Sequence, residues 1–224
     1  MTTTVPAYTA DQVRAAEKPL LDAGEPLMLR AASALARVVA DELVDRVHPR
    51  VLVLAGRGDN GGDALYAAER LAEAGMDVDA LLTSGDAHVA ALAAAMSAGV
   101  RRIEADGLDA TGYDLVVDGI VGIGAREPLR GAARETVLAM RGAELPPVVA
   151  VDLPSGLHPD EGSADDAVLP AEVTVTFGAA KCGLGGGEGL AGRIVLVDLG
   201  LDLPEATDRV EVERVVAGGD AQRA

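Results

Sequence analysis

The sequence is poor in aromatic residues and in the side chains that form disulfides or zinc sites. It has no tryptophan and one phenylalanine, so alanine and valine must build most of any core. Its single cysteine, Cys182, excludes an internal disulfide and a cysteine-ligated metal cluster, which is typical of a reducing compartment. We therefore expect a cytoplasmic protein.

Positive charge is also scarce, because the formal net charge is −17 and lysine occurs only at positions 18 and 181. Phosphate backbones and anionic membranes repel such a chain unless a basic patch overrides the total, and no such patch is present. The N-terminus lacks the pattern of a signal peptide, and the alanine-rich run over 87–100 is too short to span a bilayer. We predict no nucleic-acid partner and no membrane association.

The apolar pattern changes once along the chain. Helical patterns over 9–22 and 26–47 come first, so we expect N-terminal helices over 8–48 and no earlier strand. Short apolar runs then alternate with helical segments, as in buried parallel strands joined by crossover helices. The predicted strands are 51–54, 78–82, 100–103, 115–117, 148–151, 173–177 and 194–197, and the predicted helices are 63–74, 87–98 and 130–141.

This pattern predicts a single α/β domain over 1–224, a size that one core can support. The fold would be a Rossmann-like three-layer αβα sandwich with a mostly parallel sheet. Its core would cover 50–201, with an irregular connection over 157–169 and a frayed tail over 217–224.

Polar residues follow the ends of the predicted strands, at Asn60, Asp118, Asp152 and Lys181. In open parallel sheets, ligands bind outside the carboxyl ends of the strands, where the strand order reverses. We therefore expect these side chains to converge on one ligand. A lone lysine beside a glycine-rich loop suits a substrate phosphate, although Lys181 as an ordinary surface lysine remains an alternative.

The turn over 56–63 reads Gly-Arg-Gly-Asp-Asn-Gly-Gly-Asp and matches the spacing of a dinucleotide-binding loop. The acid that would hold a ribose is missing, because Thr83 and Ser84 follow the second strand. This absence disfavours hydride transfer. A turn over 56–63 that only connects a strand to a helix and binds nothing remains an alternative. Asn60 and Asp63 indicate a cation or a sugar hydroxyl nearby, unless Asp63 only caps the next helix.

Oxygen ligands for a cation come from three segments. Asp118 precedes a glycine-rich loop, and Ser155 follows Asp152 in a tight bend. With Asn60, these groups suit a hard monovalent ion and not zinc, although Asp118 as a turn cap is an alternative. We expect His48, His88 and His158 to lie outside the site, and Cys182 has no identifiable base partner.

Taken in order, residues 56–63, 118–131, 151–157 and 176–183 resemble the NAD(P)H-hydrate epimerase family, also called the YjeF N-terminal domain family. The resemblance implies an isomerase that interconverts the R and S forms of hydrated NADH and NADPH. It implies a potassium ion on Asn60, Asp118 and Ser155, and a separate ADP- or ATP-dependent dehydratase as partner. The implied substrate contacts are Asp59, Asn60, Gly61, Gly62, Asp63, Gly122, Ile123, Gly124, Ala125, Arg126, Glu127, Pro128 and Asp152.

The sequence departs from the family pattern at Asp59, where asparagine is usual, and at Leu29 and Ala32, where Glu and Gly are common. In the implied reaction, Asp152 would protonate the departing hydroxyl and later take a proton from the incoming water. Asp118 could exchange roles with Asp152. A non-catalytic nucleotide-binding or scaffold protein on the same fold is the alternative function. Pairing of the N-terminal helices in a homodimer and the choice between the two hydrates stay open.

Overall fold

A computed structural model describes residues 2–106, 108–124, 126–141, 144–186, 189–206 and 208–219. Within them, eight parallel strands form the main sheet, in the order β11-β9-β7-β6-β5-β2-β3-β4. This confirms the predicted α/β class and all seven predicted strands. The eighth strand, over 214–217, was not predicted and extends the sheet beyond the predicted core of 50–201. The strands of this sheet are β2 (Arg50–Ala55), β3 (Asp77–Leu82), β4 (Arg101–Ile103), β5 (Leu115–Gly119), β6 (Val148–Val151), β7 (Val173–Phe177), β9 (Arg193–Asp198) and β11 (Arg214–Ala217).

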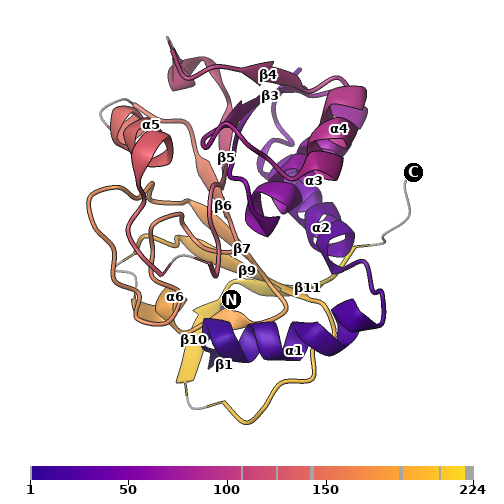
Figure 1. The fold of residues 1–224 in the computed structure, drawn as a ribbon, viewed down its shortest axis with the longest axis vertical. Coiled ribbons are helices and arrows are strands. Elements are labelled where there is room, and N and C mark those ends of the chain that lie inside the picture. Colours follow the sequence, from indigo (N-terminus) through magenta and orange to yellow (C-terminus); the bar gives the residue numbers. More distant parts are fainter. Residues whose placement is uncertain are drawn as a thin grey trace.

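Helices cover both faces of this sheet (Figure 1). The longer helices are α1 (Ala10–Asp22), α2 (Leu27–Glu42), α3 (Asp59–Glu73), α4 (Val89–Ser97) and α5 (Gly131–Arg141). Alanines, valines and leucines of α2, α3 and α4 pack on one face, and α5 packs on the other. The connection from β6 to β7 has no helix or strand, as predicted. Among the described residues, no helix is long and apolar enough to cross a membrane.

A second, three-stranded sheet corrects the prediction that helices precede every strand. Its central strand β1 (Thr3–Tyr8) pairs with β10 (Asp208–Val212) and β8 (Ala180–Lys181), and the short helix α6 (Gly183–Gly186) follows. Strand β1 is exposed over its first half and contains Pro6, and its partner β10 lies far away in the chain, so local pattern does not reveal it. Ala217 ends β11 and so does not begin a tail, while residues 220–224 lie outside the described part.

Helix α3 begins at Asp59, four residues before the predicted start, because two glycines allow close packing there. A Cβ atom on Gly61 would lie 1.9 Å from the carbonyl oxygen of Gly56, and one on Gly56 would lie 1.9 Å from that of Ile120. The first turn of α3 can therefore pack directly against the ends of β2 and β5. Asp63 lies inside the helix and does not cap it; Gly58 is the N-cap.

Candidate functional site

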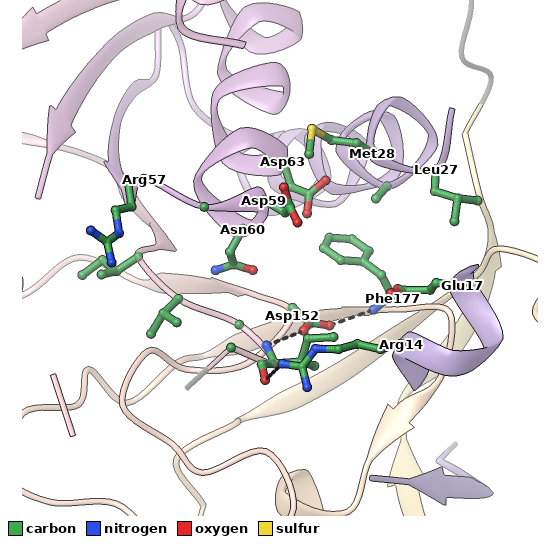
Figure 2. Close-up of a pocket in the computed structure, with 18 of the residues that line it drawn as sticks. Arg14, Glu17, Leu27, Met28, Arg57, Asp59, Asn60, Asp63, Asp152 and Phe177 are labelled. Atoms are coloured by element: carbon green, nitrogen blue, oxygen red, sulfur yellow. Dashed lines mark hydrogen bonds between the residues drawn. The ribbon is translucent and has the colours of Figure 1, made fainter. Parts of the chain in front are cut away.

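A pocket of about 790 Å³ opens at the carboxyl ends of the central strands (Figure 2). The strand order reverses here, because β3 and β4 lie on one side of β2, whereas β5, β6, β7, β9 and β11 lie on the other. This is where open α/β sheets bind ligands, and the volume lies in the range of small-molecule and cofactor sites. The start of α3, the loop after β5, the ends of β6 and β7, and helices α1 and α2 form its walls.

Seven of the predicted contact residues line this pocket: Asp59, Asn60, Asp63, Gly122, Ile123, Gly124 and Asp152. Gly61 and Gly62 are buried behind the wall, where they serve packing. Ala125 lies outside the described residues. Arg126, Glu127 and Pro128 are exposed and do not line the pocket. Arg126 donates instead to Asp11 of α1, at 2.5 Å between Nη2 and Oδ1.

Asp152, directly after β6, is the carboxylate on the floor of the pocket. It is 6% exposed and adopts φ +69°, a conformation that Asp tolerates better than most residues. Its Oδ1 accepts from the hydroxyl of Thr176 and from the backbone N–H of Phe177, each at 3.3 Å. Its Oδ2 faces the loop after β5 and accepts from the N–H of Ile123 in that loop at 3.2 Å.

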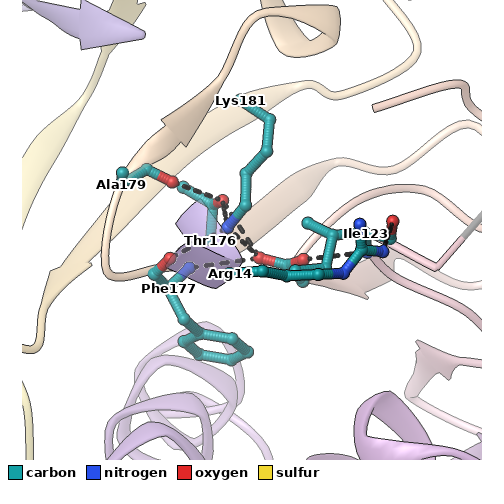
Figure 3. A network of polar contacts seen from close by, with 7 residues as sticks. Arg14, Ile123, Thr176, Phe177, Ala179 and Lys181 are labelled. Atoms are coloured by element: carbon teal, nitrogen blue, oxygen red, sulfur yellow. Dashed lines mark hydrogen bonds and ion pairs between the residues drawn. The ribbon is translucent and has the colours of Figure 1, made fainter. Parts of the chain in front are cut away.

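Lys181 lies beneath the floor and not on the pocket wall, which departs from its predicted contact with a phosphate. The side chain is 1% exposed, and Nζ donates to Oδ1 of Asp152 (Figure 3). The ammonium also donates to the Thr176 hydroxyl at 3.1 Å and to the Phe177 carbonyl at 2.8 Å. These three contacts occupy all three donors of the ammonium, so none is left for a substrate phosphate.

Asp118 and Ser155 form a second buried polar group behind the loop after β5, and both are 0% exposed. Ser155 donates to Asp118 twice, through its hydroxyl at 2.6 Å and its backbone N–H at 2.8 Å. Burial raises the pKa of Asp118, although these bonds and the N–H of Ile120 oppose the shift. No lysine or arginine contacts this carboxylate in the part of the chain that the structure describes. Asp118 is thus a buried acid without a counter-charge.

The loop Ile120–Gly124 joins the two acidic groups. The N–H of Val121 donates to the Ser155 hydroxyl at 3.0 Å, and the N–H of Ile123 donates to Asp152. Between them, a Cβ on Gly122 would lie 2.6 Å from Oδ1 of Asn60 and 2.9 Å from Oδ2 of Asp152. Only glycine therefore fits where the loop passes between these side chains.

Helix α3 supplies an acidic wall opposite Asp152. Asp63 extends from its first turns toward the opening, and its Oδ1 is covered and has no hydrogen-bond partner (Figure 2). Burial raises the pKa of Asp63 well above its usual range, and the nearby carboxylates of Asp152, Asp59 and Glu17 raise it further. Partial burial also raises the pKa of Glu17. The amide Nδ2 of Asn60 is likewise buried without a partner.

Several lining residues were not predicted from the sequence, and half of them come from the N-terminal helices. Arg14 and Glu17 of α1 face the pocket, and Nη2 of Arg14 donates to the carbonyl of Ile123 at 2.5 Å. The sequence locates site residues by their position directly after a predicted strand, and α1 comes before the main sheet, so this signal could not identify its residues. Phe177 did carry a signal, since it ends β7 beside a glycine. The other missed lining residues are Lys18, Leu21, Asp22, Leu27, Met28, Ala31, Arg57, Thr83, Ser84, Ile120, Val121, Ala133 and Leu199.

The predictions for the histidines agree with their places in the structure. None of the three lines the pocket. His88 caps α4 through Nδ1, which accepts from the N–H of Ala91, and His158 accepts backbone N–H groups of its own loop.

Comparison with known proteins connects this site to a family. Residues 24–183 match the family model described as YjeF-related protein N-terminus. An NAD(P)H-hydrate epimerase of Microbacterium testaceum is 55% identical over 88% of this chain and 80% of its own length. One of Clavibacter michiganensis subsp. michiganensis is 48% identical over 92% and 96%. A bifunctional NAD(P)H-hydrate repair enzyme of Mycobacterium tuberculosis is 45% identical over 90% of this chain and 44% of its own length.

A solved structure supports the fold independently. The crystal structure of yeast ynu0 superposes with a TM-score of 0.69 at 20% identity, over 80% of this chain and 83% of that one. The family match covers most of the chain and includes the glycine turn, the Gly122 loop and Asp152. This chain belongs to the YjeF N-terminal domain family.

Proposed function

We propose that this protein is an NAD(P)H-hydrate epimerase, which interconverts the R and S forms of hydrated NADH and NADPH. The observation that carries the proposal is the buried carboxylate Asp152, held by Lys181 on the floor of a cofactor-sized pocket at the switch point. The named relatives, at 48 to 55% identity, support the same activity.

The chemistry takes place at the ring carbon that carries the added hydroxyl beside the ring nitrogen. Inversion there proceeds by loss of the hydroxyl as water, which leaves an iminium-like ring, and by addition of water to the opposite face. A base must take a proton from the water that adds. A placed acid or base of this kind contributes about 10²–10⁴-fold.

Asp152 fits the role of the base. Its Oδ1 accepts from the Lys181 ammonium, the Thr176 hydroxyl and the Phe177 N–H, all of which stabilise the negative charge. We expected one carboxylate to act as acid and then as base. With an ammonium in contact, Asp152 is better suited to begin the reaction as the base.

The test supplies R-NADHX together with a purified dehydratase that acts only on the S form. If the protein is the epimerase, it accelerates the consumption of the R form. The Asp152→Asn variant keeps the size and the tolerated φ of the residue, and we expect it to lose at least about 10²-fold in rate. A wild-type protein that leaves the R form unchanged would overturn the proposal.

We also propose that potassium binds between Asn60, Asp118 and Ser155. The fit rests on Asp118, a buried carboxylate whose contacts are neutral donors, and on the unpartnered amide of Asn60. A flip of that amide would present its oxygen in place of Nδ2. A monovalent ion there would balance the charge of Asp118 and fix the Ile120–Gly124 loop, which also contacts Ser155.

Melting temperatures test this ion separately from activity. Potassium should stabilise the wild type in a saturable way at constant ionic strength, compared with tetramethylammonium. Asp118→Asn and Ser155→Ala should lose that stabilisation. Equal melting temperatures of the wild type in both salts would discard the site.

Epimerisation alone restores no coenzyme, so we propose an ADP- or ATP-dependent dehydratase, specific for one epimer, as the enzyme that consumes the product. The relative from Mycobacterium tuberculosis is named a bifunctional repair enzyme, and this chain covers 44% of it. We further propose a cytoplasmic location, which the unpaired thiol of Cys182 suits.

A further inference from the structure

We propose that Asp63 is the acid of this site and that it acts across the pocket from the base Asp152. The inference rests on the proposed epimerase activity. It replaces one carboxylate that does both proton transfers with two carboxylates in different environments.

The geometry places the two groups on opposite walls. Asp63 extends from α3, Asp152 follows β6, and both line the pocket between them (Figure 2). Inversion removes oxygen from one face of the ring and adds it to the other. One group on each wall suits that requirement, because a single carboxylate would have to reach both faces.

The two carboxyl groups have different partners. Asp152 contacts the Lys181 ammonium, whereas Oδ1 of Asp63 is buried without any donor. Burial raises the pKa of Asp63 first, and the carboxylates of Asp152, Asp59 and Glu17 add to the shift, against a smaller opposing effect of Lys181. Pairs of carboxylates separated in this way are how active sites assign acid and base.

Other charged groups surround Asp63 at greater range. Arg14, Lys18, Asp22 and Arg57 line the same pocket, and His88 packs beside Gly62 at the start of α4. None of them donates a hydrogen bond to Oδ1 of Asp63 in the described part of the structure.

Protons are conserved when one epimer is converted into the other. Asp63 gives its proton to the departing hydroxyl oxygen, the C–O electron pair leaves with it as water, and the lone pair of the ring nitrogen forms the C=N bond. Water then bonds to the carbon from the other face, the C=N electrons return to nitrogen, and Asp152 takes the released proton. The reverse conversion uses the same groups with exchanged roles, and solvent resets their protons.

The decisive variant is Asp63→Asn, compared with Glu17→Gln as a matched loss of another pocket carboxylate. We expect Asp63→Asn to lower kcat by at least about 10²-fold and to change KM less. In the wild type, kcat should fall as pH rises through the folded pKa of Asp63, because Asp63 then loses its proton and can no longer act as the acid. This fall is the alkaline limb of the pH profile. Asp63→Asn should lack that alkaline limb. Glu17→Gln should keep the limb but move it to lower pH, since one carboxylate that raises the pKa is gone.

Two outcomes are distinguishable. If the wild type epimerises and Asp63→Asn keeps the wild-type kcat and alkaline limb, the role of Asp63 is refuted while the proposed function stands. If the wild type itself does not epimerise, the proposed function fails first.

Stability gives a readout that does not depend on activity. The raised pKa of Asp63 means that its contribution to stability is present below about pH 4 and is lost as pH rises toward the folded pKa. Asp63→Asn should therefore match the wild type in acid and melt at a higher temperature at neutral pH. If Asp63→Asn melts at a lower temperature than the wild type at neutral pH, then Asp63 does not destabilise the folded protein there. That result would contradict the raised pKa on which its role as the acid depends.

Discussion

The ammonium of Lys181 contacts Oδ1 of Asp152 beneath the pocket, with side-chain exposures of 1% and 9%. Lysine is almost absent from this chain, so its burial at this point is informative. The pair fixes the Asp152 carboxylate in a nearly dry floor, in contact with a full positive charge. Lys181 therefore acts on the reaction through Asp152 and makes no contact with the pocket itself.

Replacing Lys181 by methionine should destabilise the fold by about 3–5 kcal/mol, because it leaves the Asp152 charge buried without its partner. The double variant with Asp152→Asn should lose less than the sum of the single variants, since it removes both charges. Denaturant unfolding of the four proteins measures this coupling. Additive losses would show that the ion pair is not a stabilising unit.

Gly122→Ala should abolish most activity while the protein still folds. Its Cβ would lie 2.6 Å from Oδ1 of Asn60 and 2.9 Å from Oδ2 of Asp152, so the loop or both side chains must move. Displacements of about 1 Å can cost about 10²-fold in rate. The control is Gly124→Ala in the same loop, whose Cβ would meet its nearest neighbour at 3.8 Å. Equal effects on kcat/KM in the two variants would contradict this account.

The sequence predicted the central sheet well because its strands are buried on both faces and read as continuous apolar runs. The ends of those strands also located Asn60, Asp118 and Asp152, since parallel strands bring their carboxyl ends to one edge. The strands that were missed are β1, β8, β10 and β11. Strand β8 has two residues, and the other three expose much of their length and so lack a continuous apolar run. Nothing local distinguishes such strands from loops.

The same limit explains the errors at the site. The pattern places Lys181 at a strand end, but whether its ammonium points into the pocket or under it depends on packing against Phe177 and Asp152. The acid Asp63 was singled out, yet its role depends on burial, on Asp59 of the same helix and on carboxylates from two other segments, Glu17 and Asp152. The residues of α1 reach the pocket because α1 packs beside the loop after β5, where Arg14 donates to Ile123, and no periodicity encodes such a tertiary contact.

The network around Asp79, at the opposite end of the sheet, should set part of the pH dependence of stability. Burial alone would raise the pKa of Asp79, but hydrogen bonds from Arg101 and Tyr113 at 2.7 Å lower it below its usual value. Its contribution is therefore present at neutral pH and is lost as pH falls through the folded pKa. Asp79→Asn should lower the melting temperature at pH 7, and the difference should shrink in acid.

The control for this network is Asp77→Asn, an exposed carboxylate at the start of the same strand. The charge of Asp77 also acts on Arg101, but both side chains are exposed, so this variant should change the melting temperature much less than Asp79→Asn across the same range. A difference between Asp79→Asn and the wild type that stays constant into acid would mean that the carboxylate charge is not what stabilises the network. The pKa of Tyr113, raised to about 12 by burial and by Asp79, should fall in Asp79→Asn and report on the contact directly.

Asp59→Asn should improve substrate binding, because it removes an exposed negative charge from the start of α3, where a pyrophosphate would approach the glycine turn. We expect KM for the hydrated coenzyme to fall several-fold at low ionic strength, and the gain to shrink with added salt as screening increases. Asp59 also raises the pKa of Asp63, so the alkaline limb of kcat should move to lower pH in the same variant. Steady-state kinetics at several pH values and salt concentrations separate the two effects. If the limb stays fixed while KM falls, then Asp59 acts on the substrate and not on Asp63.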